Sequence, residues 1–177
     1  WTMTGRLQSS VPPEQLFIER CIQFLRPGGR LGIVLPDSIL GAPGLGYIRE
    51  WLIQKTRIVA SIDLHADTFQ PRNGTQTSVL ILQKKTPEMI HEEERTGQMV
   101  NYPIFMAMVD RIGHDKRGNP IFKRDKHGNE LLFSESIVEG ESADEEEMVK
   151  IETKRKEIDD QTSLAAKTFR KWCEQEA

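Results

Sequence analysis

The sequence has few cysteines, no long apolar run and almost no net charge. Cys21 and Cys173 are its only cysteines, so we expect a reduced, cytoplasmic protein without a disulfide framework. No apolar stretch approaches the roughly 20 residues that a membrane-spanning helix needs, and no signal peptide is visible, so no membrane association is expected. The net charge of −3 does not favour nucleic-acid binding by the chain as a whole, but it does not exclude a local basic patch.

Motifs for metal binding and for nucleophilic catalysis are also missing. The four histidines do not stand at metal-ligand spacing with one another or with the cysteines, so no metal is expected. Serine, histidine and aspartate occur without a nucleophile elbow, which leaves a hydrolase unsupported. No glycine-rich cofactor loop precedes the first apolar helix. The chain opens with Trp1 rather than methionine, so we expect its natural start to lie further upstream.

What is present is an alternation of helices and strands up to Lys85. Apolar residues at helical spacing predict a helix that starts at Pro13 and ends at Pro27-Gly28-Gly29. The apolar run Leu31 to Leu35 predicts a strand buried on both faces, as in a parallel sheet. It ends at Pro36-Asp37-Ser38, and because ligands of open α/β sheets bind beyond the carboxyl ends of strands, this end is a candidate site.

A second helix and two further strands follow. The helix is predicted over Leu45 to Lys55, and the strands over Ile58 to Leu64 and Thr77 to Gln83. The connection between these strands is too short for a parallel crossover, so it favours antiparallel pairing.

The rest of the chain is more charged. It predicts, in order, a charged connection or short helix over 86–100, a strand over Tyr102 to Ile112, tight turns at two Gly-Asn pairs, a solvated acidic segment over 139–147 and a long helix from Met148 to Glu176. We therefore expect three parts: 1–85, a β-hairpin-rich extension over 86–138, and an acidic linker with a charged helix over 139–177.

Several separated blocks resemble one known family. PPEQLFIERCIQFLRPGGRLGIVLPDSILG, YIREWL, DTFQPRNGTQTSVLILQKK and IFMAMVDRIGHDKRGNP resemble the modification subunit of type I restriction–modification systems, which are N6-adenine DNA methyltransferases. The match covers most of residues 1–133. It implies an α/β fold: the C-terminal half of a class I methyltransferase (Rossmann-like) sheet with an antiparallel last strand, plus a β-rich extension and a C-terminal helix.

The resemblance also implies an activity and partners. The full-length protein would transfer a methyl group from S-adenosylmethionine to adenine in DNA and assemble with a specificity subunit, with a restriction subunit as a further candidate partner. The family's cofactor motif and its Asn-Pro-Pro-Tyr/Phe motif are absent here, so no catalytic residue is assigned and the isolated chain is expected to be inactive. Two alternatives stay open: a non-catalytic scaffolding module with half a methyltransferase fold, and a Rossmann methyltransferase that does not act on DNA.

The loop before the last predicted sheet strand carries the first candidate site. In related adenine methyltransferases an aromatic residue here stacks on the flipped target base, which implies that role for Phe69; the alternative is an aromatic that plugs the sheet edge. Gly74, Thr75 and Thr77 are expected to shape the base pocket or only to form the turn. Asp37 is expected to contact substrate or only to cap a turn or helix.

Basic residues and the C-terminal helix supply the other candidates. The basic residues around the two turns are expected to contact DNA phosphates, or to be a solvated face: Lys116, Arg117, Lys123, Arg124 and Lys126. The long helix carries apolar residues at alternating spacings of three and four, including Ile158, Phe169 and Trp172. We expect this seam to project from the sheet and bind a partner subunit; the alternative is packing on the chain's own core.

Overall fold

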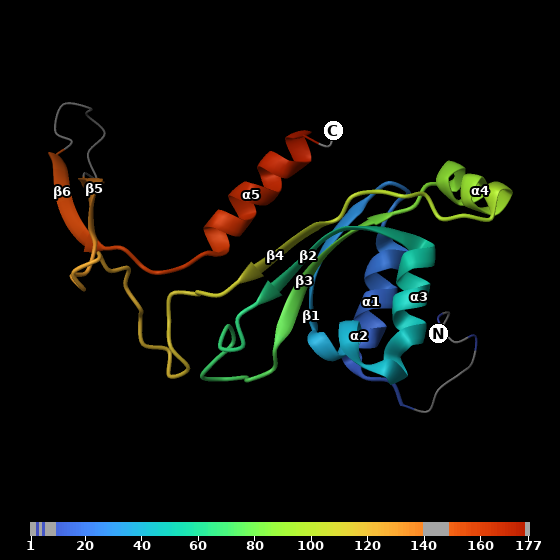
Figure 1. Cartoon of the computed structure of the whole chain (residues 1–177), viewed down its shortest axis with the longest axis horizontal. Coiled ribbons are helices and arrows are strands. Elements are labelled where there is room, and N and C mark those ends of the chain that lie inside the picture. The colour runs from blue at the N-terminus through green and yellow to red at the C-terminus, as the bar shows by residue number, and fades with distance from the viewer. Residues whose placement is uncertain (1–2, 4, 6–9, 140–148, 176–177) are drawn as a thin grey trace.

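A four-stranded mixed sheet forms the centre of the molecule. The structure is a computed structural model, and it describes residues 3, 5, 10–139 and 149–175. Three N-terminal helices cover one face of the sheet, the C-terminal helix lies on the other, and a two-stranded ribbon projects from one end (Figure 1). The chain is therefore a mixed α/β protein with an antiparallel strand, which confirms the predicted fold class.

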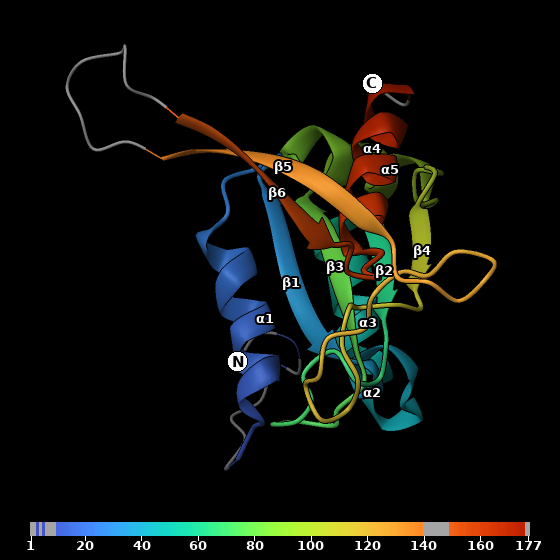
Figure 2. The same cartoon turned by 90° about the vertical axis from the view of Figure 1, so that its left-hand side faces the viewer.

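The strand order of the sheet is β1-β3-β2-β4 (Figure 2). Strand β3 (Thr77–Lys84) lies between β1 (Arg30–Pro36) and β2 (Thr56–Leu64) and runs antiparallel to both. Strand β4 (Phe105–Val109) adds to the other edge of β2 in parallel. The antiparallel pairing of β2 with β3 is confirmed, and the insertion of β3 beside β1 was not predicted.

Three α-helices precede β2 among the described residues, and the two longer ones were predicted. Helix α1 (Pro13–Phe24) begins with a proline in its first turn, and short helix α2 (Asp37–Gly41) starts directly after β1. A 3-10 turn (Pro43–Leu45) leads into α3 (Gly46–Lys55), which agrees with the predicted second helix. Proline suits a first helical turn because its missing N–H would have no partner there.

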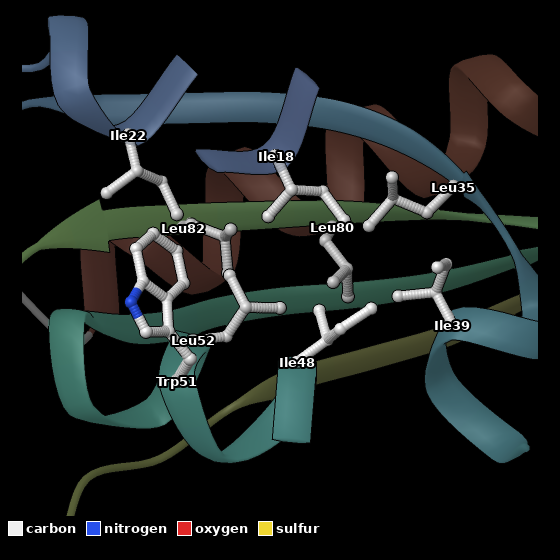
Figure 3. Close-up of a cluster of buried hydrophobic side chains, with 9 residues drawn as sticks. All are labelled: Ile18, Ile22, Leu35, Ile39, Ile48, Trp51, Leu52, Leu80 and Leu82. Carbon is white, nitrogen blue, oxygen red and sulfur yellow. The ribbon is translucent and has the colours of Figure 1, made fainter. Parts of the chain in front are cut away.

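The main core lies between these helices and the sheet (Figure 3). Its buried members come from α1, β1, α2, α3 and β3: Ile18, Ile22, Leu35, Ile39, Ile48, Trp51, Leu52, Leu80 and Leu82. Burying an aliphatic side chain of this size stabilises the fold by about 1.5–3 kcal/mol. This cluster holds α1 and α3 side by side against β3.

Two predictions of burial were wrong. Strand β1 is buried on one face only: Leu35 is 1% exposed, whereas Val34 is 47% exposed. On α1 the buried apolar positions are Ile18 and Ile22, while the predicted apolar residue Phe17 is 64% exposed. The apolar residues of α1 and β1 are thus more numerous than those that the other described residues bury.

The region after Lys85 contributes a helix and one further strand of the sheet. Helix α4 (Pro87–Thr96) fills part of the predicted charged connection, with the Thr86 side chain accepting a bond from the Met89 backbone N–H at its start. Strand β4 then pairs with β2. Backbone pairing of β4 thus extends the same sheet beyond residue 85, the predicted boundary of the first part.

The predicted long helix from residue 148 is wrong in its first part. Residues Val149–Lys156 form strand β6, which pairs antiparallel with β5 (Leu132–Glu139). Helix α5 covers only Thr162–Gln175, and Asp160 caps its start by accepting a bond from the Thr162 N–H at 2.7 Å. Val149, Ile151 and Thr153 alternate with polar residues, a pattern of period two that suits a strand. The predicted acidic segment lies, from Gly140 on, outside the described residues.

Helix α5 packs on its own sheet, which contradicts the prediction that it projects. Phe169 and Trp172 pack against Phe105 of β4, with ring centroids 5.4 and 5.8 Å from that of Phe105. Ala165 joins the same cluster on β2 and β4. Ile158 is no part of the helix: it pairs with Phe122 in an isolated bridge and is 51% exposed. The predicted apolar seam is therefore not continuous. Ile158 lies in a loop, whereas Phe169 and Trp172 lie on a helix that packs against the sheet of the same chain.

Candidate functional site

Polar side chains meet at the end of the sheet where β1 and β2 have their carboxyl ends; this end is called the polar sheet edge below. The Ser78 hydroxyl, at the start of β3, donates a 2.8 Å hydrogen bond to Asp37 Oδ1. Asp63, near the end of β2, stands opposite Ser78 in the ladder. Its Oδ1 atom is buried and has no hydrogen-bond partner among the described residues. Since a buried carboxylate oxygen without a donor is costly, this edge is suited to receive a hydrogen-bond donor.

Sequence reasoning anticipated only part of this edge. Asp37 was proposed as a substrate contact or a cap; in the structure it opens α2, and α2 has no side-chain cap bond. Asp63 and Ser78 were not singled out. The signal that could have found Asp63 is an acidic residue near the end of an otherwise apolar strand, because the carboxyl ends of strands line ligand sites in α/β sheets.

The loop between β2 and β3 carries Phe69 on an ordered turn. The Phe69 carbonyl accepts bonds from the backbone N–H groups of Arg72 and Asn73, at 3.2 and 3.0 Å, and the Gln70–Pro71 peptide bond is cis. The Phe69 side chain is 42% exposed and belongs to neither core cluster. Its ring is therefore available for contact with another molecule.

The other predicted pocket residues separate into two groups. Gly74 and Thr75 are exposed on this loop, and a Cβ atom at Gly74 would lie 2.7 Å from Gln70 Nε2. Thr77, by contrast, is buried in β3, and its hydroxyl has no hydrogen-bond partner among the described residues. The Gln70 side chain thus lies over Gly74 in the loop, while Thr77 belongs to the strand.

Two tight turns after β4 repeat one geometry. Asp115 Oδ1 accepts from the Arg117 and Asn119 N–H groups, and Asp125 Oδ1 accepts from the corresponding groups of His127 and Asn129, all at 2.8–2.9 Å. The glycine of each turn has a left-handed φ, 85° at Gly118 and 89° at Gly128. This conformation is easily adopted only by glycine.

These hydrogen bonds lower the pKa of both turn aspartates. The Asn119 side-chain amide holds the pKa of Asp115 below its ordinary value, and the Asn129 amide does the same for Asp125. Because the folded-state pKa is lowered, the stabilisation is present above the ordinary pKa and is lost as the pH falls through the lowered one. Both carboxyl groups are therefore ionised at neutral pH and can accept these hydrogen bonds.

The first of these turns lies beside the Phe69 loop. A Cβ atom at Gly118 would lie 3.4 Å from Pro71 Cδ, and the two loops lie side by side in both views (Figures 1 and 2). Lys116 and Arg117 are exposed on this turn. The fold therefore places the loop that carries exposed Phe69 beside the turn that carries exposed Lys116 and Arg117, about 47 residues further along the sequence.

The five predicted phosphate contacts are not equivalent. Lys123 Nζ lies 2.6 Å from Glu157 Oε1, and Arg124 lies 4.0 Å from Glu130. No ion pair involving Lys116, Arg117 or Lys126 occurs in the part of the chain that the structure describes. The turn tips thus carry three exposed cations outside these ion pairs, one of which, Arg117, also acts on the Asp115 carboxylate through its charge.

Within the described ranges there is no metal centre and no membrane span. No group of three histidine, cysteine or acidic residues there could hold a metal ion, and no described helix is long and apolar enough to cross a bilayer. A methyl-donor site does not fit these residues either: β1 runs through Pro36 directly into α2, without the glycine turn that lets a cofactor approach the backbone.

Comparison with known proteins gave one family match and several structural likenesses. The family model described as N-6 DNA Methylase matches residues 5–125. No curated protein matched.

The structural likenesses are partial. The EcoKI M protein of a type I restriction enzyme is 32% identical over 44% of this chain and 16% of its own, with a TM-score of 0.39. A putative class I S-adenosylmethionine-dependent methyltransferase from Listeria monocytogenes is 21% identical over 58% of this chain and 28% of its own (TM-score 0.45). A modification subunit of a putative type I restriction enzyme from Vibrio vulnificus is 18% identical over 65% and 29% (TM-score 0.38).

The chain spans less than a third of the length of each of these structures. The family match covers more than half of the chain, and it includes the sheet, the Phe69 loop and the first turn. This chain belongs to the N-6 DNA methylase family.

Proposed function

We propose that this chain is the C-terminal part of a type I modification subunit that methylates adenine N6 in DNA. Family membership supports the reaction class. The observation that carries the proposal is the placement of exposed Phe69 beside the turn of Lys116 and Arg117, next to the polar sheet edge. An enzyme that modifies a base must take it out of the stack, and an aromatic ring with nearby cations can hold both the base and its phosphates.

S-adenosylmethionine is the methyl donor in this proposal. Because the described residues do not fit it, the donor is bound by parts of a longer polypeptide. The role of this chain is to complete the sheet, to bind the flipped adenine through Phe69 and to contact DNA phosphates. Asp63, Ser78 and Asp37 supply hydrogen-bonding groups at the sheet edge that faces the same site.

The proposed protein partner is a specificity subunit, and a restriction subunit is a further candidate. Phe169 and Trp172, its predicted anchors, pack on β4 and are only partly exposed. Ile158, 51% exposed, and Leu164, 61% exposed, are the apolar residues of this region that remain available.

Replacing Phe69 with alanine should weaken capture of the target base in the complete enzyme. Loss of aromatic stacking costs about 1–3 kcal/mol per base, which corresponds to roughly a 5- to 150-fold loss. The measurements are the methylation rate and the fluorescence of 2-aminopurine at the target adenine, which rises when that base leaves the stack. Phe69→Trp should be milder because the ring is kept.

The matched control is Phe133→Ala, since Phe133 is 43% exposed but lies on β5, away from the loop. Phe133→Ala should change neither readout. The stacking role of Phe69 is wrong if both alanine variants reduce methylation equally, or if Phe69→Ala leaves the 2-aminopurine signal intact.

Replacing Lys116 and Arg117 with alanine should reduce the salt dependence of DNA binding. Each phosphate contact contributes about 0.9 to the slope of log affinity against log salt, so the double variant should flatten that slope by about 2. Binding to all sequences should weaken about equally, because phosphates carry no base identity.

The control is the double variant Lys123→Ala and Arg124→Ala. Both side chains already face carboxylates, so the slope should change less than in the turn variant. An equal change in both variants would show that the slope reports overall charge and not contacts at the turn.

A further inference from the structure

Three polar side chains form a row across the sheet at the end opposite the candidate site. Arg30 of β1 stands opposite Gln83 of β3, and Gln83 stands opposite Arg57 of β2. Residues directly opposite each other in neighbouring strands point to the same face, about 4.5–5.5 Å apart at Cβ. Two arginines are thus held on either side of one glutamine.

Helix α5 turns this row into a pocket. Trp172 and Cys173, together with Pro103, line a cavity of about 160 Å³ over Arg30, Arg57 and Gln83. The Gln83 amide donates to the Gly28 carbonyl at 3.2 Å, which orients that side chain. No acidic residue lines the cavity, so it is a small, cationic and partly apolar recess.

The Arg57 guanidinium is held in place by an aromatic ring, but one of its hydrogen-bond donors has no acceptor among the described residues. It lies over the Tyr102 ring, 4.6 Å from the ring centroid, and the Tyr102 hydroxyl accepts a bond from the Ile58 backbone N–H at 3.2 Å. The Arg57 Nε atom is buried and has no hydrogen-bond partner among the described residues. Neither Arg30 nor Arg57 has an ion pair there. A buried donor without an acceptor carries a desolvation cost, which a bound acceptor removes.

We propose that this pocket binds a small, doubly charged oxyanion of the phosphate type between Arg30 and Arg57. A guanidinium presents its N–H groups in a planar fork that matches the spacing of oxyanion oxygens, and two arginines can neutralise a dianion. The cavity admits a single tetrahedral ion and leaves the Trp172 indole as one wall. The site lies at the amino ends of β1 and β2, so its occupation does not compete with the Phe69 loop.

Cys173 gives a direct test because it lines the pocket, while Cys21 lies on α1, outside it. The full chain is treated with iodoacetamide, and alkylation of each cysteine is followed by peptide mass spectrometry in increasing inorganic phosphate, with sodium chloride at equal ionic strength as reference. Phosphate should slow alkylation of Cys173 saturably and leave Cys21 unchanged.

Arginine variants then identify the ligands. Arg30→Met and Arg57→Met should each weaken phosphate protection about tenfold, as expected for the loss of charge-assisted hydrogen bonds. Arg57→Lys, which keeps the charge but loses the fork, should also weaken it. The control Arg170→Met removes the same charge from an exposed position on α5 and should leave protection unchanged. Far-UV circular dichroism checks the folding of each variant.

Isothermal titration calorimetry of the wild-type chain with inorganic phosphate gives an independent readout. Four results would overturn the site: equal protection by chloride, protection retained in both methionine variants, equal weakening by Arg170→Met, or protection by a DNA duplex but not by phosphate.

Discussion

Replacing Phe105 with alanine is expected to lower the free energy of unfolding by about 3–5 kcal/mol. Phe105 is 9% exposed, and its ring meets both aromatic rings of α5. The substitution removes the surface on which α5 packs, so cavity formation adds to the lost apolar contact. Urea unfolding followed by circular dichroism measures the free energy, and a red shift of tryptophan emission in the folded variant accompanies exposure of Trp172 if Trp51 stays buried in the main core.

Met106→Ala on the same strand is the control, because Met106 is 76% exposed and should matter little. A double-mutant cycle with Phe169→Ala should give a coupling free energy clearly different from zero, since the rings touch. Additive effects, or a Phe105→Ala effect no larger than that of Met106→Ala, would show that α5 does not rest on β4 in solution.

Replacing Glu93 with glutamine is expected to cost about 3–5 kcal/mol of the free energy of unfolding, because it leaves a buried cation without its partner. The Lys85 side chain is 1% exposed, and its Nζ lies 2.6 Å from Glu93 Oε2. Glu93 is the carboxylate that α4 brings to the end of β3. Thermal and urea unfolding of the variant measure the loss.

The second change, Lys85→Met in the same chain, should recover most of that stability. An apolar residue needs no counter-ion in this buried place, and replacing both members of a buried pair is often nearly neutral. The exposed pair of Arg95 and Glu92 is the control: Arg95→Gln should leave the unfolding curve nearly unchanged, since both side chains are about half exposed or more. A Glu93→Gln effect as small as that of Arg95→Gln would contradict the buried-pair interpretation.

Much of the first 85 residues could be predicted because local patterns there agree with the fold. The periodicity of α1, the apolar runs of β1 to β3 and the turn at Pro27-Gly28-Gly29 each have one strong interpretation. The segment from residue 148, by contrast, allowed two interpretations. Its charged, helix-prone residues and spacings of three and four predict a helix, whereas Val149, Ile151 and Thr153 also alternate as in a strand. Pairing with β5 decided in favour of the strand, and that contact is far from local.

The candidate site shows the same division. Resemblance to a family pointed to Phe69 and the basic turns, but not to their contact, which depends on Pro71 lying against Gly118. The sequence also could not show that Lys123 and Arg124 face carboxylates, because this depends on the positions of Glu157 and Glu130 in the fold.

The sequence by itself determined the two longer helices and the three strands up to Lys85, the tight turns and the family, because these depend on near-neighbour periodicity and on motifs. The tertiary structure alone decided which strands lie side by side, where α5 packs and which polar groups meet. Strand order and register bring Arg30, Gln83 and Arg57 into one row, and Asp63 opposite Ser78. No local pattern encodes such pairings, since they arise from the burial of one sheet face against helices that are distant in the chain.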